Sequence, residues 1–272
     1  MSRSDKENPE CRLCDGSLSH RFDLRILGTH DVQYFECTNC GSLQTEPPHW
    51  LDEAYGNENL SSLDTGAAQR NVHNLAACFA ICRLFNFRNA IDVGGGDGLL
   101  CRMLRDHEIN CYVKDKYATP SYAQGFTEQN FDTPDLLIGF ELLEHFANPK
   151  SDLEELFQHH PSALLLSTEL YTNEDSDWWY LAPESGQHVF FYSKKALELI
   201  ASRFDYSPVF SGGFVLLLKN ASPLKKAFAR LLLNRFVCRL IRGIVVILPA
   251  RGTSKDHTLQ VEKTKHAQHK IE

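Results

Sequence analysis

The chain has 272 residues, which allows one large domain with an appendage or two modest domains. Hydrophobic residues make up 43% and charged residues 23%, so the composition excludes wholesale disorder and allows a sizeable core. From Asn220 onward 11 lysines and arginines stand against three acids, a net +8, and because the total is −7 the first 219 residues carry −15. An acidic body repels nucleic-acid phosphates, so we expect no DNA partner and disfavour RNA.

The N-terminus bears on location, and the cysteines that follow bear on metal binding. Residues 1–8 contain no apolar run behind their charges, so we expect no secretory signal and a reducing, cytoplasmic environment. Two CxxC pairs follow, Cys11 with Cys14 and Cys37 with Cys40, and 22 residues separate them. This spacing lets four thiolates converge on one tetrahedral Zn²⁺ while the intervening segment forms a hairpin.

The alternatives to a zinc site are chance pairing of buried cysteines and a redox role, although a redox CxxC needs only one pair. We predict a structural Zn²⁺ that stabilises a segment too small to build its own core. The remaining cysteines lack such company and are expected to be small core residues: Cys78, Cys82, Cys101, Cys111 and Cys238.

A linker is expected after the cysteines, because paired prolines at 47 and 48 precede a polar run without periodicity. We therefore expect a zinc-knuckle module with its linker over residues 1–60 and a second domain over residues 61–220. Within the second domain strand-like and helix-like segments alternate. Strands are predicted at 90–93, 110–113, 136–140 and 163–167, and helices at 68–85, 99–107, 151–158 and 194–202.

Alternating elements of these lengths predict a doubly wound α/β fold with a parallel sheet and right-handed crossovers. Two further strands, 207–210 and 213–219, are separated by only two residues. So short a connection predicts that this last pair is antiparallel.

A glycine-rich turn follows the first strand of this domain, in the sequence Asp92-Val-Gly94-Gly-Gly96-Asp-Gly98. Such a turn lets the backbone approach a ligand at the carboxyl end of a strand. No Gly-Lys-Ser/Thr follows, so the turn is not a phosphate-binding P-loop. It resembles motif I of the class I S-adenosylmethionine-dependent methyltransferases, whose fold is Rossmann-like, and the resemblance spans roughly residues 67–219.

The resemblance implies S-adenosyl-L-methionine as the cofactor and gives individual residues a role. Asp92 would help to orient the methionine amino group, and the three glycines would lie against the cofactor. Asp115, 19 residues after Gly96, stands where the family has the carboxylate that binds the ribose hydroxyls. A nicotinamide cofactor is the alternative, but it requires a Tyr-Lys or His pair for proton transfer that we cannot assign.

The strand at 136–140 leads into Glu141-Leu-Leu-Glu144-His145, which resembles the family's motif around its fourth strand. Phe140 and Glu141 are therefore expected at the cofactor. Glu141, Glu144 and His145 are spaced so that they project to one side. The element also resembles the metal-binding element of the small-RNA 2′-O-methyltransferases and the ubiquinone-biosynthesis O-methyltransferases, which implies Mg²⁺ or Mn²⁺.

His188 stands where the RNA group has a further histidine, so it is a candidate fourth ligand or a general base. Many methyltransferases carry Leu-Glu-His without a metal, with the glutamate capping the next helix, and that alternative stays open. We take His145, His188 and Glu144 as the candidate catalytic residues, because transfer to oxygen requires removal of a proton. Trp178, Trp179 and Tyr180 are candidates for an acceptor wall, with core packing as the alternative.

The zinc knuckle, the methyltransferase motifs and the Trp-Trp-Tyr run together resemble a bacterial group related to sugar methyltransferases. Members of that group act on nucleotide-linked sugars or surface glycans, and their C-methyltransferases carry an additional large C-terminal domain that this chain lacks. We therefore expect a sugar hydroxyl as the acceptor, in surface-glycan or nucleotide-sugar biosynthesis. The alternatives are a sugar C-methyltransferase, a metal-dependent RNA 2′-O-methyltransferase and a non-catalytic zinc-binding scaffold.

A basic helix is predicted towards the C-terminus, within residues 221–250. In the segment 227–248 seven apolar residues share one face, and Arg235, Arg239 and Arg242 lie opposite. The apolar residues are Leu233, Phe236, Val237, Leu240, Ile241, Ile244 and Ile247. Four arginines argue against a membrane-spanning helix. We expect an interfacial helix that contacts an anionic membrane through residues 222–250, on the inner face of the cytoplasmic membrane.

The alternative for this helix is packing on the sheet with its arginines in solvent. Residues 251–272 are polar and basic, and are expected to be disordered. The sequence leaves the oligomeric state open.

Overall fold

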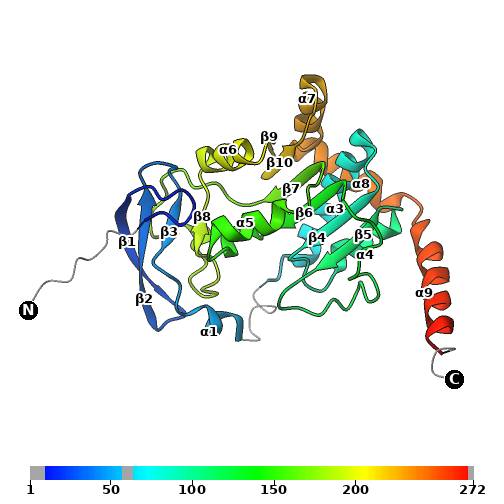
Figure 1. The fold of residues 1–272 in the computed structure, drawn as a ribbon, viewed down its shortest axis with the longest axis horizontal. Coiled ribbons are helices and arrows are strands. Elements are labelled where there is room, and N and C mark those ends of the chain that lie inside the picture. Colours follow the sequence, from blue (N-terminus) through cyan, green and yellow to red (C-terminus); the bar gives the residue numbers. More distant parts are fainter. Residues whose placement is uncertain (1–9, 57–63, 269–272) are drawn as a thin grey trace, which may run out of the picture. The chain divides into compact units, whose positions relative to one another are not determined.

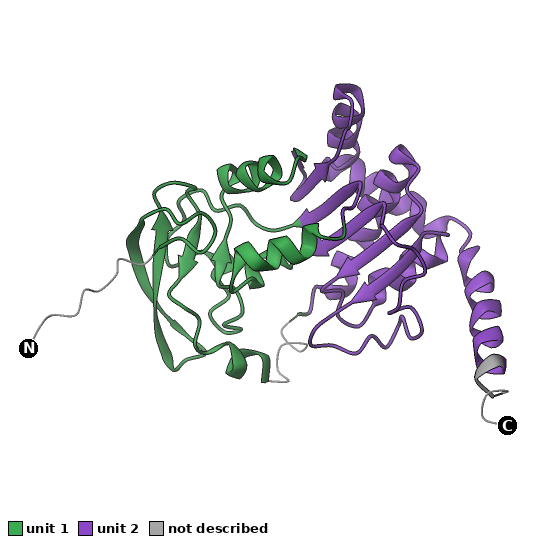
Figure 2. Ribbon diagram, in the orientation of Figure 1, with its two compact units in different colours: residues 1–64, 141–159, 167–208 green, residues 65–140, 160–166, 209–272 purple. Residues whose placement is uncertain are grey.

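The computed structural model describes residues 10–56 and 64–268 (Figure 1). The chain divides into two compact units, drawn in green and purple in Figure 2. Unit 1 contains residues 1–64, 141–159 and 167–208, and unit 2 contains 65–140, 160–166 and 209–272. The expected boundary between residues 60 and 61 lies outside the described residues. The division also differs from the expected one, because the unit that holds the cysteine pairs includes two segments from the second predicted domain.

A six-stranded sheet forms the centre of unit 2, in the order β5-β4-β6-β7-β10-β9. Its strands are β4 (Asn89–Val93), β5 (Asn110–Lys114), β6 (Leu136–Phe140), β7 (Ala163–Ser167), β9 (Ser207–Ser211) and β10 (Phe214–Leu218). β4 lies between β5 and β6 and pairs in parallel with both. A two-residue turn joins β9 and β10, which therefore form an antiparallel hairpin. The predicted mixed α/β sheet is confirmed.

Helix α3 (Ala67–Phe85) carries much of the unit 2 core, because it buries seven residues between Leu75 and Cys82. It contacts α4 (Leu99–Asp106), α7 (Pro223–Leu232) and α8 (Arg235–Ile247). The five cysteines outside the CxxC pairs are all buried, as expected of small core residues.

The single helix predicted over 227–248 is wrong in one respect, because the segment forms two helices. Ser222 caps α7 by accepting a hydrogen bond from Lys225 N, and Pro223 occupies its first turn. Asn234 then interrupts the helix and caps α8, since its side chain accepts from Phe236 N at 3.0 Å. The apolar periodicity continues through this break, which is why periodicity alone missed it.

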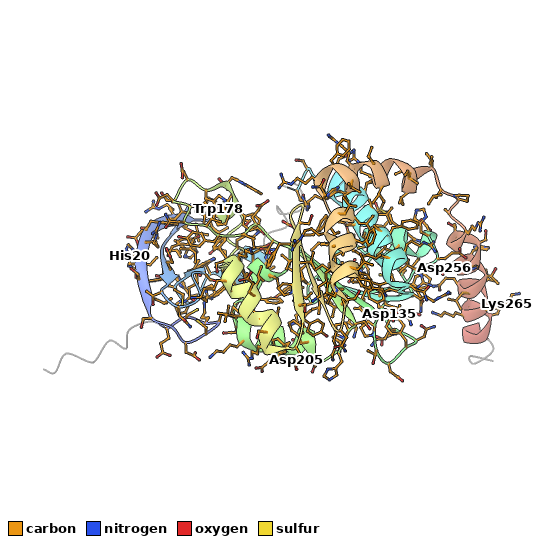
Figure 3. All side chains as sticks on the ribbon, turned by 90° about the horizontal axis from the view of Figure 1, so that it is seen from above. His20, Asp135, Trp178, Asp205, Asp256 and Lys265 are labelled. Carbon is orange, nitrogen blue, oxygen red and sulfur yellow. The ribbon has the colours of Figure 1, made fainter. Side chains whose placement is uncertain are left out.

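The expectation of disorder after residue 250 is also wrong, because Gly252–Gln268 form helix α9. Asp256 fixes this helix to α4 (Figure 3). It accepts two hydrogen bonds from Arg105, at 2.7 and 2.8 Å, and one from Arg102 at 2.7 Å. Farther along α9, Lys263 donates to the carbonyl of Gly125 at 3.1 Å. This helix was not predicted because its sequence is polar. Ion pairs rather than an apolar face hold it in place.

A four-stranded antiparallel sheet forms the centre of unit 1, in the order β1-β2-β3-β8. The strands are β1 (Leu18–Ile26), β2 (His30–Cys37), β3 (Leu43–Thr45) and β8 (Phe190–Phe191). The hairpin predicted between the cysteine pairs is confirmed as β1 and β2. The unexpected strand is β8, which comes from far along the chain and pairs with β3 through Phe191 opposite Leu43.

Short helical segments complete unit 1: α1 (Leu51–Gly56), η1 (Leu143–His145), α5 (Pro149–Phe157), η2 (Trp179–Leu181) and α6 (Lys194–Arg203). Its core is aromatic and includes Tyr34, Trp50, Tyr180 and Phe191. The indole of Trp50 donates to the carbonyl of Gly186 at 2.8 Å, so this buried N–H is satisfied. No helix in the described part of the chain is both long and apolar enough to span a bilayer.

Candidate functional site

The glycine turn after β4 adopts the backbone that only glycine takes readily. Gly94, Gly96 and Gly98 have φ values of 69°, 53° and 76°, all in the left-handed region. A Cβ on Gly98 would lie 2.7 Å from the Cβ of Ala123, so that position also needs glycine for close packing. A Cβ on Gly96 would have no heavy atom within 4 Å, so this residue borders open space. The backbone of the turn is therefore open to its surroundings at Gly96.

Asp92 lies at the base of this turn with its side chain removed from solvent. The residue is 3% exposed, and its Oδ2 is buried without a hydrogen-bond partner among the residues that the structure describes. Burial, followed by the nearby charge of Asp115, raises the pKa of Asp92 to about 7. A buried carboxylate without a partner fits a ligand that brings a cationic group, such as the amino group of S-adenosylmethionine.

Asp115 lies at the end of the neighbouring strand and is held by three backbone groups. Its Oδ2 accepts from Gly96 N at 2.9 Å, and its Oδ1 accepts from Tyr117 N and Ala118 N at 2.8 and 2.7 Å. The structure thus joins the glycine turn and Asp115 within unit 2, as the sequence spacing suggested.

Phe140 and Glu141 were the other residues expected at the cofactor. Phe140 is half-buried and packs against Phe214, with ring centroids 5.6 Å apart. Glu141 belongs to unit 1, has φ 48°, and its Oε1 accepts a hydrogen bond from Ser167 Oγ at 2.7 Å. The backbone N–H of Glu141 donates to the same hydroxyl. Ser167, at the end of β7, was not anticipated, because a lone serine at a strand end carries no distinctive signal.

Three of the four residues proposed as divalent-metal ligands come together in unit 1. Glu144, His145 and His188 each offer a ligand atom within 4.8 Å of the others. The rings of His145 and His188 meet edge to face with centroids 5.0 Å apart. Glu141, which the sequence analysis placed beside Glu144 and His145 as a possible ligand, is not part of this group.

Hydrogen bonds to neighbouring groups orient this cluster. Glu144 is fully buried, and its Oε1 accepts from the Tyr180 hydroxyl at 2.6 Å, while its Oε2 has no partner. His188 Nδ1 lies 2.7 Å from the carbonyl oxygen of Tyr180 and must donate to it, which leaves its Nε2 as an acceptor. His145 Nδ1 lies 3.2 Å from the hydroxyl of Tyr55. The sequence assigned Tyr55 only to a linker and did not indicate this contact with His145.

Burial shifts the pKa of every member of the cluster towards favouring the neutral form. It raises the pKa of Glu144 to about 8, and the charge of Glu141 adds to that shift. Burial, followed by repulsion from His188, lowers the pKa of His145 to about 3. Burial also lowers the pKa of His188, but the hydrogen bond to Tyr180 and the charge of Glu141 oppose the shift. His188 is therefore the better proton acceptor of the two histidines.

The aromatic run before His188 divides between core and surface. Tyr180 is 2% exposed and belongs to the unit 1 core, and Trp178 packs against it with ring centroids 5.4 Å apart. Trp179, in contrast, is 71% exposed. Of these three residues, only Trp179 therefore offers a flat ring to a soluble ligand. Core packing explains Trp178 and Tyr180.

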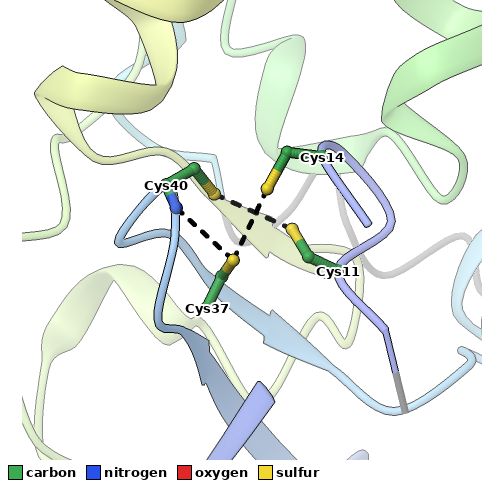
Figure 4. A group of neighbouring side chains, drawn as sticks. All are labelled: Cys11, Cys14, Cys37 and Cys40. Carbon is green, nitrogen blue, oxygen red and sulfur yellow. Dashed lines mark hydrogen bonds between the residues drawn. The ribbon is translucent and has the colours of Figure 1, made fainter. Parts of the chain in front are cut away.

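The four cysteines of the CxxC pairs converge as their spacing predicted (Figure 4). The Sγ atoms of Cys11 and Cys40 are 3.7 Å apart, and those of Cys14 and Cys37 are 3.5 Å apart. Sulfurs bound to one zinc at about 2.3 Å in a tetrahedron are separated by about 3.8 Å. The pKa of Cys40 is lowered to about 5, chiefly by its hydrogen bond with Cys11, so one thiol of the group ionises readily. The donor set fits Zn²⁺.

One residue of the first knuckle connects the cysteines to the Glu144 cluster. The guanidinium of Arg12 donates to the carbonyls of Ala147 and Val189, at 2.9 and 2.6 Å. These carbonyls lie just beyond His145 and His188 in the sequence. Val189 N in turn donates to the carbonyl of Glu144 at 2.8 Å. Nothing in the sequence distinguishes Arg12, because these two carbonyls belong to residues 135 and 177 positions away.

The sheet order of unit 2 and its glycine turn between two aspartates define a Rossmann-like α/β protein of the class I methyltransferase type. Residues 62–209 match the model of a family described as a methyltransferase domain. The chain belongs to this methyltransferase family. A comparison with curated proteins finds no match.

Three solved structures illustrate the likeness of fold. The methyltransferase domain of bacterial CtHen1 is 16% identical, with 56% of this chain and 99% of that one covered and a TM-score of 0.40. Magnesium protoporphyrin IX methyltransferase from Synechocystis, solved with bound SAH, is 14% identical over 62% and 93%, with a TM-score of 0.45. The Burkholderia thailandensis 1,6-didemethyltoxoflavin N1-methyltransferase is 12% identical over 73% and 99%, with a TM-score of 0.46.

Proposed function

We propose that this protein is an S-adenosylmethionine-dependent methyltransferase whose acceptor is a sugar hydroxyl, in surface-glycan or nucleotide-sugar biosynthesis. The observation that carries the cofactor is Asp92, whose buried Oδ2 has no partner beside a turn that leaves space at Gly96. A cofactor with an amino group and a sulfonium would supply the missing positive charge. When bound, it would supply an electrophilic methyl group, and all remaining chemistry falls to side chains of this chain.

Removal of the acceptor's proton is assigned to His188. Its Nδ1 donates to Tyr180, so its Nε2 is oriented and has a lone pair for a hydroxyl proton. The same hydrogen bond and the charge of Glu141 favour the imidazolium that forms. His145 is a weaker candidate for the base because its pKa is lowered to about 3.

A sugar acceptor is supported by Trp179 and by the charge of the chain. Trp179 is 71% exposed and offers a flat face on which a sugar ring can stack. The first 219 residues carry a net −15, which opposes an RNA acceptor. Localisation on the cytoplasmic side is part of this proposal, because nucleotide-linked sugars are expected there.

Methyl transfer assisted by a divalent metal ion is supported by a separate observation. Glu144, His145 and His188 lie within mutual reach of one cation, and Glu144 Oε2 is buried without a partner. Two imidazoles and one carboxylate suit Mn²⁺ better than Mg²⁺, which prefers oxygen ligands. These three residues would hold the ion, and the ion would polarise the acceptor oxygen.

Cofactor binding and transfer are tested in two steps. Isothermal titration with S-adenosylmethionine should show one site, and absence of affinity would leave only the scaffold alternative. Mass spectrometry of cell-envelope glycans, with and without the protein, should then reveal loss of one methylene group. Unchanged glycans, together with RNA retention that strengthens as salt falls, would favour the RNA enzyme instead.

The cluster is tested by substitution. We expect Glu144→Ala and His145→Ala to abolish turnover and to leave cofactor affinity unchanged, because Asp92 and Asp115 are intact. Mn²⁺ titration followed by electron paramagnetic resonance should show binding to the unmodified protein and none to the variants. Full activity after exhaustive chelation would contradict the metal-assisted version and leave the methyltransferase proposal intact.

A further inference from the structure

Helix α8 has two apolar faces, and only one of them is buried. Cys238 and Val245 are 0% and 1% exposed on the face that packs in unit 2, where α8 contacts α3. At about 100° per residue a second row of large apolar residues falls on the opposite side. This exposed row consists of Phe236, Leu240, Ile244 and Ile247, which are 68%, 56%, 54% and 80% exposed.

Helix α7 repeats the pattern. It buries Ala229, and Leu233 at its end is buried as well. Leu224, Phe228 and Leu231 follow one another at helical spacing on the other side and are 66%, 49% and 55% exposed. Two consecutive helices thus leave seven large apolar side chains in water. Scattered apolar residues are ordinary on a surface, but two continuous rows mark an interaction surface.

The charges around these rows have one sign. No Asp or Glu occurs between residues 206 and 255. Seven basic residues lie within 222–251: Lys225, Lys226, Arg230, Arg235, Arg239, Arg242 and Arg251. Arg235, Arg239 and Arg242 follow one side of the exposed row of α8, since they recur at intervals of four and three. The partner must therefore offer an apolar phase bordered by negative charge.

We infer that α7 and α8 form a surface by which the protein binds an anionic lipid bilayer, with both helices in the plane of the interface. A bilayer of this kind buries the apolar rows below its headgroups and attracts the flanking arginines. A nucleic acid would meet the arginines and leave the apolar rows in water. A second copy of the chain would bring two basic borders together, which charge repulsion opposes.

Of the two sequence-based alternatives for this helix, packing on the domain is met in part, because α8 contacts α3, and membrane contact is the inference made here. One face of α8 packs within unit 2, and the other stays available for a membrane. Because the packed face is needed by unit 2, deletion of residues 222–272 would expose core side chains. Point substitutions on the exposed row test the inference without that complication.

The experiment measures sedimentation of the full chain with lipid vesicles. Vesicles of phosphatidylcholine and phosphatidylglycerol in a 3:1 ratio should pellet the protein, and vesicles of phosphatidylcholine alone should pellet much less. Raising the salt concentration should reduce binding, because the headgroup attraction is screened. Equal binding to both vesicle types, or no binding to the anionic ones at low salt, would overturn the inference.

Substitutions separate the apolar and the charged contributions. Leu240→Gln combined with Ile247→Gln should weaken binding at least tenfold, because two side chains lose their burial in the bilayer. Arg235→Gln combined with Arg239→Gln should weaken it roughly 25-fold at low salt, about fivefold for each charge. The matched control is Leu199→Gln on α6, whose residue is 44% exposed and far from these helices in the sequence.

Two further measurements keep the result interpretable. Thermal unfolding should be the same for all variants, and S-adenosylmethionine titration should be unaffected, since the surface lies outside the proposed site. Failure of the methyltransferase proposal would leave the vesicle result standing. Sedimentation equilibrium in the absence of lipid should show a monomer, and a dimer that the Leu240→Gln and Ile247→Gln pair dissociates would assign the surface to self-association instead.

Discussion

Asp92 combines two properties that a residue selected for stability alone would not have. Its carboxyl group is almost fully buried, and one of its oxygens has no hydrogen-bond partner. Leaving a buried polar atom unpaired costs on the order of 1–3 kcal/mol. That cost is understandable if a ligand provides the missing partner, and this explanation leads to a pH-dependent prediction.

Affinity for S-adenosylmethionine should increase between pH 6 and pH 8. The pKa of Asp92 is raised to about 7, so the carboxylate that would meet the cationic ligand forms across this range. Asp92→Asn should bind weakly and without this pH dependence, as measured by isothermal titration. A wild-type affinity that is constant from pH 6 to 8 would contradict the role assigned to Asp92.

The raised pKa of Asp92 also affects the stability of the ligand-free protein. Asp92 keeps its proton in the folded state up to about pH 7, whereas in the unfolded chain it loses the proton near pH 3.8. The unfolded state therefore binds fewer protons within this window, and stability should fall as pH rises through it. Thermal unfolding of Asp92→Asn should show a smaller decline over the same range.

Arg12 links the segment that carries the first CxxC pair to the segments that carry the Glu144 cluster. Arg12→Gln should remove the hydrogen bonds to the Ala147 and Val189 carbonyls and loosen the segments that carry His145 and His188. We expect turnover to fall at least tenfold with unchanged S-adenosylmethionine affinity. Reaction of the two histidines with diethyl pyrocarbonate should accelerate, as followed by peptide mass spectrometry.

Arg25→Gln provides the control, because Arg25 pairs with Asp31 on the surface of the same unit. That variant should leave turnover and histidine reactivity unchanged. Partial rescue by Arg12→Lys, which retains a donor, would support a positioning role. Equal loss in Arg12→Lys and Arg12→Gln with slow histidine modification would argue against it.

At the scale of single elements, the most buried ion pair of α9 joins Asp256 to Arg105. Asp256 and Arg105 have side chains that are 11% and 6% exposed, and their contact is bidentate. Although burial alone would raise it, the pKa of Asp256 is lowered, because Arg105 and Arg102 donate hydrogen bonds to the carboxylate. Removing one partner of such a pair leaves the other charge buried without compensation.

Asp256→Ala should therefore destabilise the protein by about 3 kcal/mol, as measured by denaturant unfolding. Lys255→Ala is the matched control on the same helix, because the pair of Lys255 with Glu108 is exposed to solvent. That variant should unfold like the unmodified protein. Equal stability of Asp256→Ala and Lys255→Ala would show that α9 does not contribute to folding.

The elements of unit 2 illustrate what a sequence can reveal. The strand 136–140 and the helix starting at Leu99 were predicted at their observed positions, because apolar runs and glycines mark them locally. The break at Asn234 was missed, since a capping asparagine interrupts a continuous apolar pattern. Helix α9 was missed because its contacts with Arg105 join residues about 150 positions apart.

The candidate site likewise contains residues that could be predicted from the sequence and residues that could not. The glycine turn, Asp115 and the four cysteines were recognisable, because each belongs to a motif with fixed spacing. Tyr55, Ser167 and Arg12 were not, since each acts through hydrogen bonds to residues that are distant in the sequence. Side-chain contacts of this kind depend on the completed tertiary structure and leave no periodic or spacing signal.

At the scale of the whole molecule, unit 1 is discontinuous in sequence. Residues 10–56 contain the cysteines, and the Glu144 cluster lies in segments 141–159 and 167–208 of the same unit. Removal of the proposed zinc should therefore accelerate hydrogen exchange in all three segments. Exchange within 65–140 should stay unchanged, since these residues belong to unit 2.

Hydrogen exchange followed by mass spectrometry, before and after treatment with a strong chelator, measures this effect. S-adenosylmethionine titration of the chelated protein should still show binding. Acceleration confined to residues 10–45 would mean that the cysteine segment unfolds independently of the cluster. A protein purified without zinc, yet with slow exchange throughout, would contradict the structural role of the metal.

The late origin of β8 affects how the nascent chain acquires its fold. The first three strands of that sheet end at Thr45, whereas Phe190 and Phe191 leave the ribosome about 145 residues later. At 5–20 residues per second this delay lasts roughly 7–30 s. Throughout it the backbone edge of β3 lacks its neighbour, and captured zinc would help to hold the early hairpin together. Metal supply during translation should therefore govern the yield of native protein more strongly than metal supply afterwards.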